Sequence, residues 1–244
     1  MDNLRFKEIC ESIISVKRER GGIGTLGEKT LHAVLKQYFA PDKTSHEITI
    51  GAFVADIVTD DGIVEIQTRA FNKLRNKLIK FLEQSPVTVV YPIPKTKWLL
   101  WIDEQTGEIS KKRKSPKQGR IYDVFPELYK IKPMLNHPNF RLCLVLIDME
   151  EYRYLNGWSK DKKKGSTRCD MVPLNIVEEI YINETSDYII FLPDGLKAQF
   201  TSKDYKNAAH TSLRTSQTAL NILTNMGIIE RVGKQGRLYK YKRT

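Results

Sequence analysis

Residues 53–68 read FVADIVTDDGIVEIQT, and this stretch decides how we interpret the first part of the chain. Two runs rich in β-branched and apolar residues, 53–58 and 63–68, are separated by the turn sequence DDG. The pattern predicts two adjacent strands joined by a tight turn. Each run contains one acid, Asp56 or Glu65, within a segment that is otherwise suited to burial.

The two acids predict a metal site. Burying a carboxylate among aliphatic side chains costs several kcal/mol unless the acid is paired or binds a cation. Because the two strands are adjacent, we expect Asp56 and Glu65 to lie close together. The sequence therefore predicts a divalent-cation site, with Mg²⁺ or Mn²⁺ as the cofactor.

The flanking sequence predicts further elements in a definite order. A helix over 26–39 and a strand over 47–50 precede the two strands, and a helix over 72–83 and a strand over 87–91 follow them. With this order around its acids, the chain over about 20–92 resembles the PD-(D/E)XK nuclease superfamily. The resemblance implies an α+β or α/β fold, with a restriction-endonuclease-like mixed sheet flanked by helices.

The resemblance also implies roles for four residues. In that family an Asp and the Glu of an E-x-K motif hold Mg²⁺, often with help from a helical Glu, and these positions match Asp56, Glu65 and Glu28. The family's Lys is Gln67 here, a variant that active members also carry. Gln67 would orient the attacking water by hydrogen bonding instead of by charge. The implied catalytic set is therefore Glu28, Asp56, Glu65 and Gln67.

The helix predicted over 72–83 contains lysines that could supply the positive charge missing at Gln67. Lys73 and Lys77 lie one helical turn apart, and they could partly replace the missing lysine or contact DNA. The alternative is that these lysines belong to a solvated amphipathic face.

Positive charge is concentrated at the C-terminal end. Residues 201–244 carry nine basic and two acidic side chains, whereas residues 1–92 carry 13 and 12. The sequence predicts a short helix from an N-cap at Thr201 through Ala209, and a helix over about 216–226 capped by Thr215. Two strands over 228–232 and 237–241 follow, joined by a Gly-containing loop. This succession resembles a winged helix-turn-helix domain.

A winged helix implies DNA contacts from its second helix and its wing. The residues expected to face the major groove are Arg214, Ser216, Gln217 and Asn221, and those expected on the wing are Arg231, Lys234 and Arg237. The alternative is a winged helix used for protein contacts or dimerisation.

Two cationic segments lie between these regions. Residues 111–120 contain six cations and no acid, including Arg113 and Lys114. Residues 157–168 form a glycine-bracketed basic turn that includes Lys163 and Arg168. Both segments are suited to contacting phosphate groups, and solvated loops are the alternative for both.

Length and composition set the remaining expectations. With 244 residues the chain is expected to form two domains. These are a nuclease-like domain over 1–195, with its core at about 20–92 and a basic β-rich extension over 93–195, and a winged-helix domain over 196–244. Charged residues near the N-terminus and short apolar runs argue against a signal peptide or membrane span. Three widely separated cysteines favour a cytoplasmic protein.

The function expected from these features is metal-dependent cleavage of DNA by an endonuclease with an appended DNA-binding domain. Cutting both strands of a duplex usually requires two active sites, so a homodimer is also expected. Two alternatives remain open. One is a catalytically inactive nuclease-like protein with a DNA-binding or regulatory role, and the other is a protein-interaction adaptor. The four histidines, His32, His46, His137 and His210, lack ligand spacing and are expected to be structural.

Overall fold

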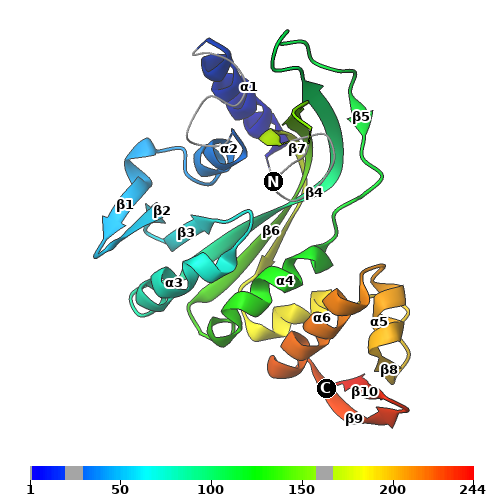
Figure 1. Cartoon of the computed structure of the whole chain (residues 1–244). Helices are drawn as coiled ribbons and strands as arrows, with labels where there is room; N and C mark the ends of the chain where they lie inside the picture. The colour runs from blue at the N-terminus through cyan, green and yellow to red at the C-terminus, as the bar shows by residue number, and fades with distance from the viewer. Residues whose placement is uncertain (1, 20–29, 158–166) are drawn as a thin grey trace.

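The protein, seen here as a computed structural model, is described over residues 2–19, 30–157 and 167–244 (Figure 1). Within these ranges a mixed sheet of seven strands has the order β1-β2-β3-β4-β6-β7, with β5 added to β4. The strands are β1 (His46–Ile50), β2 (Phe53–Thr59), β3 (Gly62–Ile66), β4 (Val87–Ile102), β5 (Arg113–Lys114), β6 (Phe140–Tyr154) and β7 (Arg168–Ile182).

The sheet combines antiparallel and parallel pairs. β1, β2 and β3 form an antiparallel meander, whereas β3–β4 and β4–β6 are parallel pairs, and β7 returns antiparallel to β6. Parallel neighbours need a crossover connection, which η2 (Phe71–Leu74) and α3 (Arg75–Leu82) supply between β3 and β4. The fold is therefore a mixed α+β arrangement with a large mixed sheet.

Helices cover both faces of the sheet. On one face α1 (Asn3–Glu19) and α2 (Thr30–Phe39) pack against it through a cluster that includes Phe6, Leu35 and Val145. On the other face lie α3, η3 (Ile121–Val124), α4 (Phe125–Leu128), η4 (Tyr129–Met134) and η5 (Thr185–Phe191). β6 is covered on both sides, which explains the continuous apolar run over 142–147.

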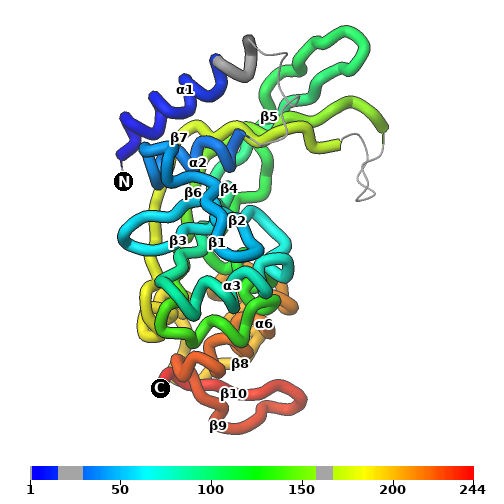
Figure 2. The backbone as a smooth tube through the Cα atoms, turned by 90° about the vertical axis from the view of Figure 1, so that its left-hand side faces the viewer, coloured from blue at the N-terminus to red at the C-terminus, as the bar shows by residue number. Residues whose placement is uncertain are grey.

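The C-terminal module, residues 200–244, is a compact helical pair with a small sheet. It contains β8 (Phe200–Thr201), α5 (Ser202–Ala208), α6 (Leu213–Asn225), β9 (Ile229–Gln235) and β10 (Leu238–Arg243). The three strands pair in the order β8-β10-β9. Figure 2 shows this module at the end of the molecule opposite α1.

The two helix caps of the module were predicted with different success. The predicted cap at Thr201 is confirmed, because its side chain accepts the N–H of Asp204 while the Asp204 carboxylate accepts the N–H of Thr201. The predicted cap at Thr215 is wrong. Ser212 caps α6 by accepting the Thr215 N–H at 3.0 Å, so the helix begins at Leu213, three residues earlier than expected.

One hydrophobic cluster crosses the boundary predicted at residue 195. It joins Phe125 and Leu128 of α4 to Tyr205 and Leu220 of the module. The Tyr205 hydroxyl also donates a 2.6 Å hydrogen bond to the carbonyl of Phe191. The module therefore packs as part of the main core.

Several other predicted bounds shift. β3 ends at Ile66 instead of continuing to 68, and the strand predicted over 87–91 continues to Ile102. The helix predicted over 72–83 is divided into η2 and α3, and the first part of the helix predicted over 26–39 lies outside the described residues. No described helix has the length and apolar character needed to cross a membrane.

Candidate active site where β2 and β3 diverge

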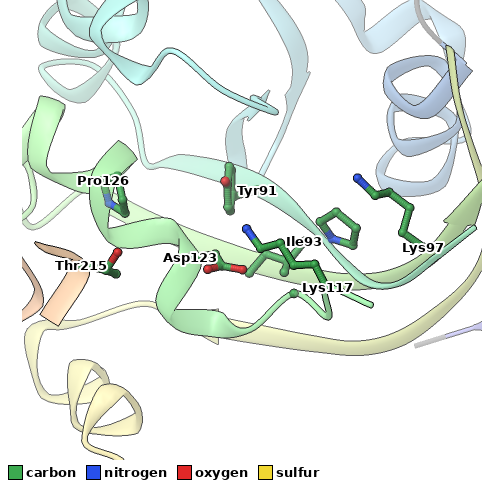
Figure 3. A pocket seen from close by; sticks show the side chains of 9 residues that line it. Tyr91, Ile93, Lys97, Lys117, Asp123, Pro126 and Thr215 are labelled. Atoms are coloured by element: carbon green, nitrogen blue, oxygen red, sulfur yellow. The ribbon is translucent and has the colours of Figure 1, made fainter. Parts of the chain in front are cut away.

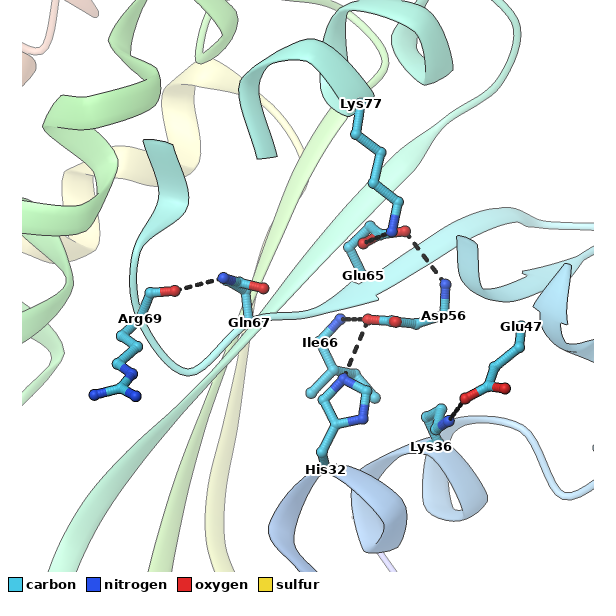
Figure 4. Close-up of polar contacts among 9 residues, drawn as sticks. All are labelled: His32, Lys36, Glu47, Asp56, Glu65, Ile66, Gln67, Arg69 and Lys77. Carbon is cyan, nitrogen blue, oxygen red and sulfur yellow. Dashed lines mark hydrogen bonds and ion pairs between the residues drawn. The ribbon is translucent and has the colours of Figure 1, made fainter. Parts of the chain in front are cut away.

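The two predicted acids lie where β2 and β3 separate. Regular pairing of the strands runs from Thr59 and Gly62 as far as Ile57 and Val64. Beyond that point each carboxylate accepts an N–H from the neighbouring strand (Figure 4). Asp56 Oδ2 accepts the N–H of Ile66 at 2.8 Å, and Glu65 Oε1 accepts the N–H of Asp56 at 3.3 Å. The two side chains thus occupy one junction in the sheet.

Each acid has a second partner, supplied by a helix. His32 of α2 places Nε2 3.3 Å from Asp56 Oδ2, and Lys77 of α3 places Nζ 2.6 Å from Glu65 Oε2. These helices pack on opposite faces of the sheet. Lys77 also lies 5.7 Å from the centre of the Phe81 ring. The site therefore carries a cation at Glu65 although Gln67 supplies none.

The two carboxyl groups differ in acidity. Burial raises the pKa of Glu65 to about 7, and the Asp56 charge adds to this rise while Lys77 opposes it. Burial also acts to raise the pKa of Asp56, but the hydrogen bond and charge of His32, with the Ile66 N–H, hold that pKa below its usual value. Neighbouring carboxyl groups whose pKa values are pushed apart are typical of acid–base sites and of structural ion pairs.

Gln67 lies just beyond the end of β3. Its N–H donates to the Val90 carbonyl at 2.9 Å, which continues the alignment with β4 for one more residue. Its side-chain Nε2 donates to the Arg69 carbonyl at 2.5 Å. The amide group is thereby oriented, and its oxygen remains as the atom that a water molecule could bind. Glu28, the fourth predicted catalytic residue, lies outside the described residues.

The carboxylate oxygens at the junction suit a cation that takes few ligands from the protein. Within the described residues no group of three or more His, Cys, Asp or Glu side chains is arranged to hold a metal ion. Mg²⁺ commonly binds through one or two carboxylates and completes its shell with water and substrate phosphate oxygens. Asp56 and Glu65 fit that pattern, and the carbonyl of Ile66, whose N–H contacts Asp56, would be a further oxygen donor. Such a cation would take the position that Lys77 holds at Glu65.

The other cations predicted in the nuclease-like region lie apart from the two acids. In the described part of the chain Lys77 contacts Glu65, whereas Lys73 of η2, Arg113 and Lys114 of β5, and Arg168 of β7 contact neither acid. Arg168 instead lies 3.6 Å from Glu151. Lys163 lies outside the described residues.

The predicted DNA-facing residues of α6 divide into two groups. Arg214 and Gln217 are exposed at the start of the helix. Ser216 is fully buried and donates a 2.6 Å hydrogen bond to the Ser202 carbonyl, so the prediction that it faces DNA is wrong. Ser216 precedes the buried Ala219 and Leu220 by three and four residues, so it lies on their inward face of α6. Asn221 is half-buried, and its Oδ1 accepts from Lys132 Nζ at 2.8 Å.

The hairpin of β9 and β10, the predicted wing, exposes all three cations expected there, Arg231, Lys234 and Arg237. Arg231 and Lys234 lie 4.4 and 5.2 Å from the centre of the Tyr239 ring. Cation–π contacts of this kind hold charged groups over an aromatic face. This hairpin therefore presents positive charge on paired strands.

His32 is the residue of the junction that the sequence analysis did not select. It was expected to be structural, yet it contacts Asp56. The available signal was its spacing of four residues from Glu28, which would place both on one face of a helix.

A family model with the description "Domain of unknown function (DUF8091)" matches residues 29–183. The chain belongs to this family. The matched DUF8091 region runs from α2 to β7, so it contains Asp56 and Glu65 and ends before the C-terminal module.

One similar protein comes from Treponema pallidum (strain Nichols), where it carries the name "Uncharacterized protein". It is 33% identical over 147 residues, which amounts to 60% of this chain and 56% of the relative. The chain thus matches little more than half the length of that relative. No solved structure gives a significant match.

Proposed function

We propose that the chain is a metal-dependent endonuclease of the PD-(D/E)XK type that hydrolyses DNA phosphodiester bonds. The observation that carries this proposal is the junction itself. Asp56 and Glu65 come from adjacent strands, each binds the backbone of the other strand, and Lys77 adds a cation 2.6 Å from Glu65. The order α2-β1-β2-β3-α3-β4 around this junction is the arrangement expected of a restriction-endonuclease-like core.

In this proposal Asp56 and Glu65 hold Mg²⁺ or Mn²⁺, with Glu28 as a third ligand. When bound, such a cation neutralises charge on the scissile phosphate and increases the acidity of a bound water. Lys77, released from Glu65, would stabilise phosphate charge, and the Gln67 amide oxygen would orient the attacking water. The exposed cations of the wing would hold the DNA backbone.

A second function is favoured by the same contacts. His32 and Lys77 already provide partners for both carboxylates, so the junction is satisfied by protein groups alone. This favours a nuclease-like scaffold that binds DNA without cutting it. In that case the acids serve only to hold β2 and β3 together where their pairing ends.

Plasmid cleavage with Mg²⁺ or Mn²⁺ distinguishes the two functions. Asp56→Asn keeps the size of the side chain and removes its charge, so cleavage should fall about 100-fold or more, as for loss of one group that stabilises transition-state charge. Asp103→Asn, which alters a half-buried acid that accepts the Gln105 N–H in a surface turn, is the matched control and should cut like wild type.

Titration calorimetry with Mn²⁺ should detect binding by wild type and its loss in Asp56→Asn. Equal residual cleavage by wild type and Asp56→Asn, purified in the same way, would assign the activity to a contaminant and leave the scaffold.

A further inference from the structure

Among the described residues, no strand pairs with one edge of β4 between two backbone contacts. At one end the Gln67 N–H donates to the Val90 carbonyl at 2.9 Å, and at the other the Gly119 N–H donates to the Pro94 carbonyl at 2.8 Å. Alternate residues of a strand direct their backbone groups to the same edge, so Pro92 faces this opening too. Pro92 and Pro94 have no N–H, and the opening therefore leaves no backbone donor unsatisfied at these positions.

Two cavities meet at this opening. The larger, about 340 Å³, lies between β4, η3, α4 and the first turn of α6, where Tyr91, Lys117 and Thr215 face it (Figure 3). The smaller, about 170 Å³, lies toward α2 and includes Thr68 and Arg69 in its wall. Both are lined by Tyr91, Pro94 and Lys97, so they adjoin. The larger cavity has the volume of a small ligand site.

Gly119 brings the basic segment 111–120 against this opening. A Cβ atom at Gly119 would lie 2.4 Å from the Pro94 carbonyl oxygen and 2.7 Å from Ile93 Cγ2. Only glycine permits this approach of the two backbones. The contact places Lys117 beside the cavity, at the end of the segment closest to α6.

The walls of the two cavities carry an excess of positive charge. Their cations are Arg69, Lys97, Lys117 and Arg168, and their acids are Asp123 and Glu151.

The two acids are already engaged. Glu151 is buried, and Lys97, at 2.7 Å, together with Arg153 and Arg168, holds its pKa below the usual value although burial opposes ionisation. Asp123 accepts the Arg120 N–H at the start of η3. Among the described residues Arg69 and Lys117 have no acidic partner, so their charge is available to a ligand.

We propose that this opening binds one nucleotide of a single nucleic-acid strand that passes the Asp56–Glu65 junction. Its phosphate would lie between Arg69 and Lys117, and its base would lie against Tyr91 and Pro126. Arg69 follows Gln67 by two residues, which connects the opening directly to the candidate active site. The inference rests on the proposal that the chain acts on nucleic acid, but it does not require cleavage.

The shape of the opening selects a single strand over a duplex. The cavity is open to solvent on one side and bounded by β4, the segment ending at Gly119 and α6, and it has the volume of one small ligand. Single-strand sites combine cations that follow the backbone with apolar or aromatic surface for the bases. Thr215 belongs to the wall, so the C-terminal module would form part of this subsite in addition to any contact through its wing.

The test measures binding of a labelled single-stranded oligonucleotide of about six nucleotides to the full chain by fluorescence anisotropy, in EDTA. Lys117→Gln and Arg69→Gln should each weaken binding about 3- to 10-fold and lower the salt slope by about 0.7. Lys111→Gln is the matched control, because Lys111 is exposed in the same basic segment and does not line either cavity. It should change affinity less than about twofold.

Equal losses in all three variants would show diffuse surface attraction and overturn the inference, as would equally strong competition by a blunt duplex. Binding that depends on Lys117 and Arg69 without any cleavage would support the subsite and refute the nuclease. Cleavage that depends on Asp56, with binding unaffected by Lys117→Gln, would support the nuclease and refute the subsite. A wild-type chain that binds no oligonucleotide would refute the subsite, and plasmid cleavage would decide the nuclease separately.

Discussion

Replacing Glu65 with Gln tests whether burial or the Lys77 ion pair controls the charge of this side chain. Glu65 is 1% exposed, and Gln preserves its size and its capacity to accept the Asp56 N–H. The pKa of Glu65 is about 7 in the folded protein, against an ordinary value of 4.5. The folded state therefore holds a proton that the unfolded chain releases at lower pH.

This difference sets the sign and size of the effect. Below pH 4.5 both states are protonated, so the stabilising contribution is fully present there. As the pH rises toward 7 the unfolded chain ionises first and the contribution is lost. Each unit of pKa difference is worth about 1.4 kcal/mol, so wild type should lose about 3 kcal/mol relative to Glu65→Gln between pH 4.5 and 8. Asp56, whose pKa is lowered, stays ionised throughout this window.

Urea denaturation in EDTA at pH 4.5 and pH 8 measures the difference, with Glu83→Gln as the control. Glu83 is an exposed acid directly after α3 and forms a surface pair with Lys80. A stability difference between wild type and Glu65→Gln that is flat across this range would refute the reasoning. A wild type that gains stability with pH relative to Glu65→Gln would show that Lys77 outweighs burial.

Two further predictions follow from single contacts. If Lys77 supplies the charge that Gln67 lacks, Lys77→Gln should reduce plasmid cleavage about 10- to 100-fold. Adding Gln67→Lys to that variant should restore cleavage. Absence of rescue would make Lys77 a structural partner of Glu65. Gly119→Ala should lower the free energy of unfolding by about 1–3 kcal/mol, because its Cβ would collide with the Pro94 carbonyl; calorimetric melting that matches wild type would contradict this close approach.

The order of elements from α2 to β4 follows closely from the sequence, because its signals are local, whereas α1 was not predicted. Runs of β-branched and apolar residues and the DDG turn specify β2 and β3 without any distant contact. The error at α6 has the same local origin. Ser212 and Thr215 are both suitable caps, and the choice depends on the Ser212 hydroxyl reaching the Thr215 N–H.

The surroundings of the two acids depend on tertiary packing. Asp56 and Glu65 were predicted as a pair because their strands are joined by a short turn, but His32 and Lys77 reach them from helices on opposite faces of the sheet. The packing of α4 against the C-terminal module could not be predicted either, because apolar positions in the sequence do not specify which partner they contact.

The two prolines in the open stretch of β4 also limit what can associate with it. An exposed strand edge normally invites pairing by a strand of another chain, which can lead to aggregation. Pro92 and Pro94 cannot donate the hydrogen bonds that such a ladder requires at successive positions on one edge. This part of β4 is therefore protected from unwanted strand addition.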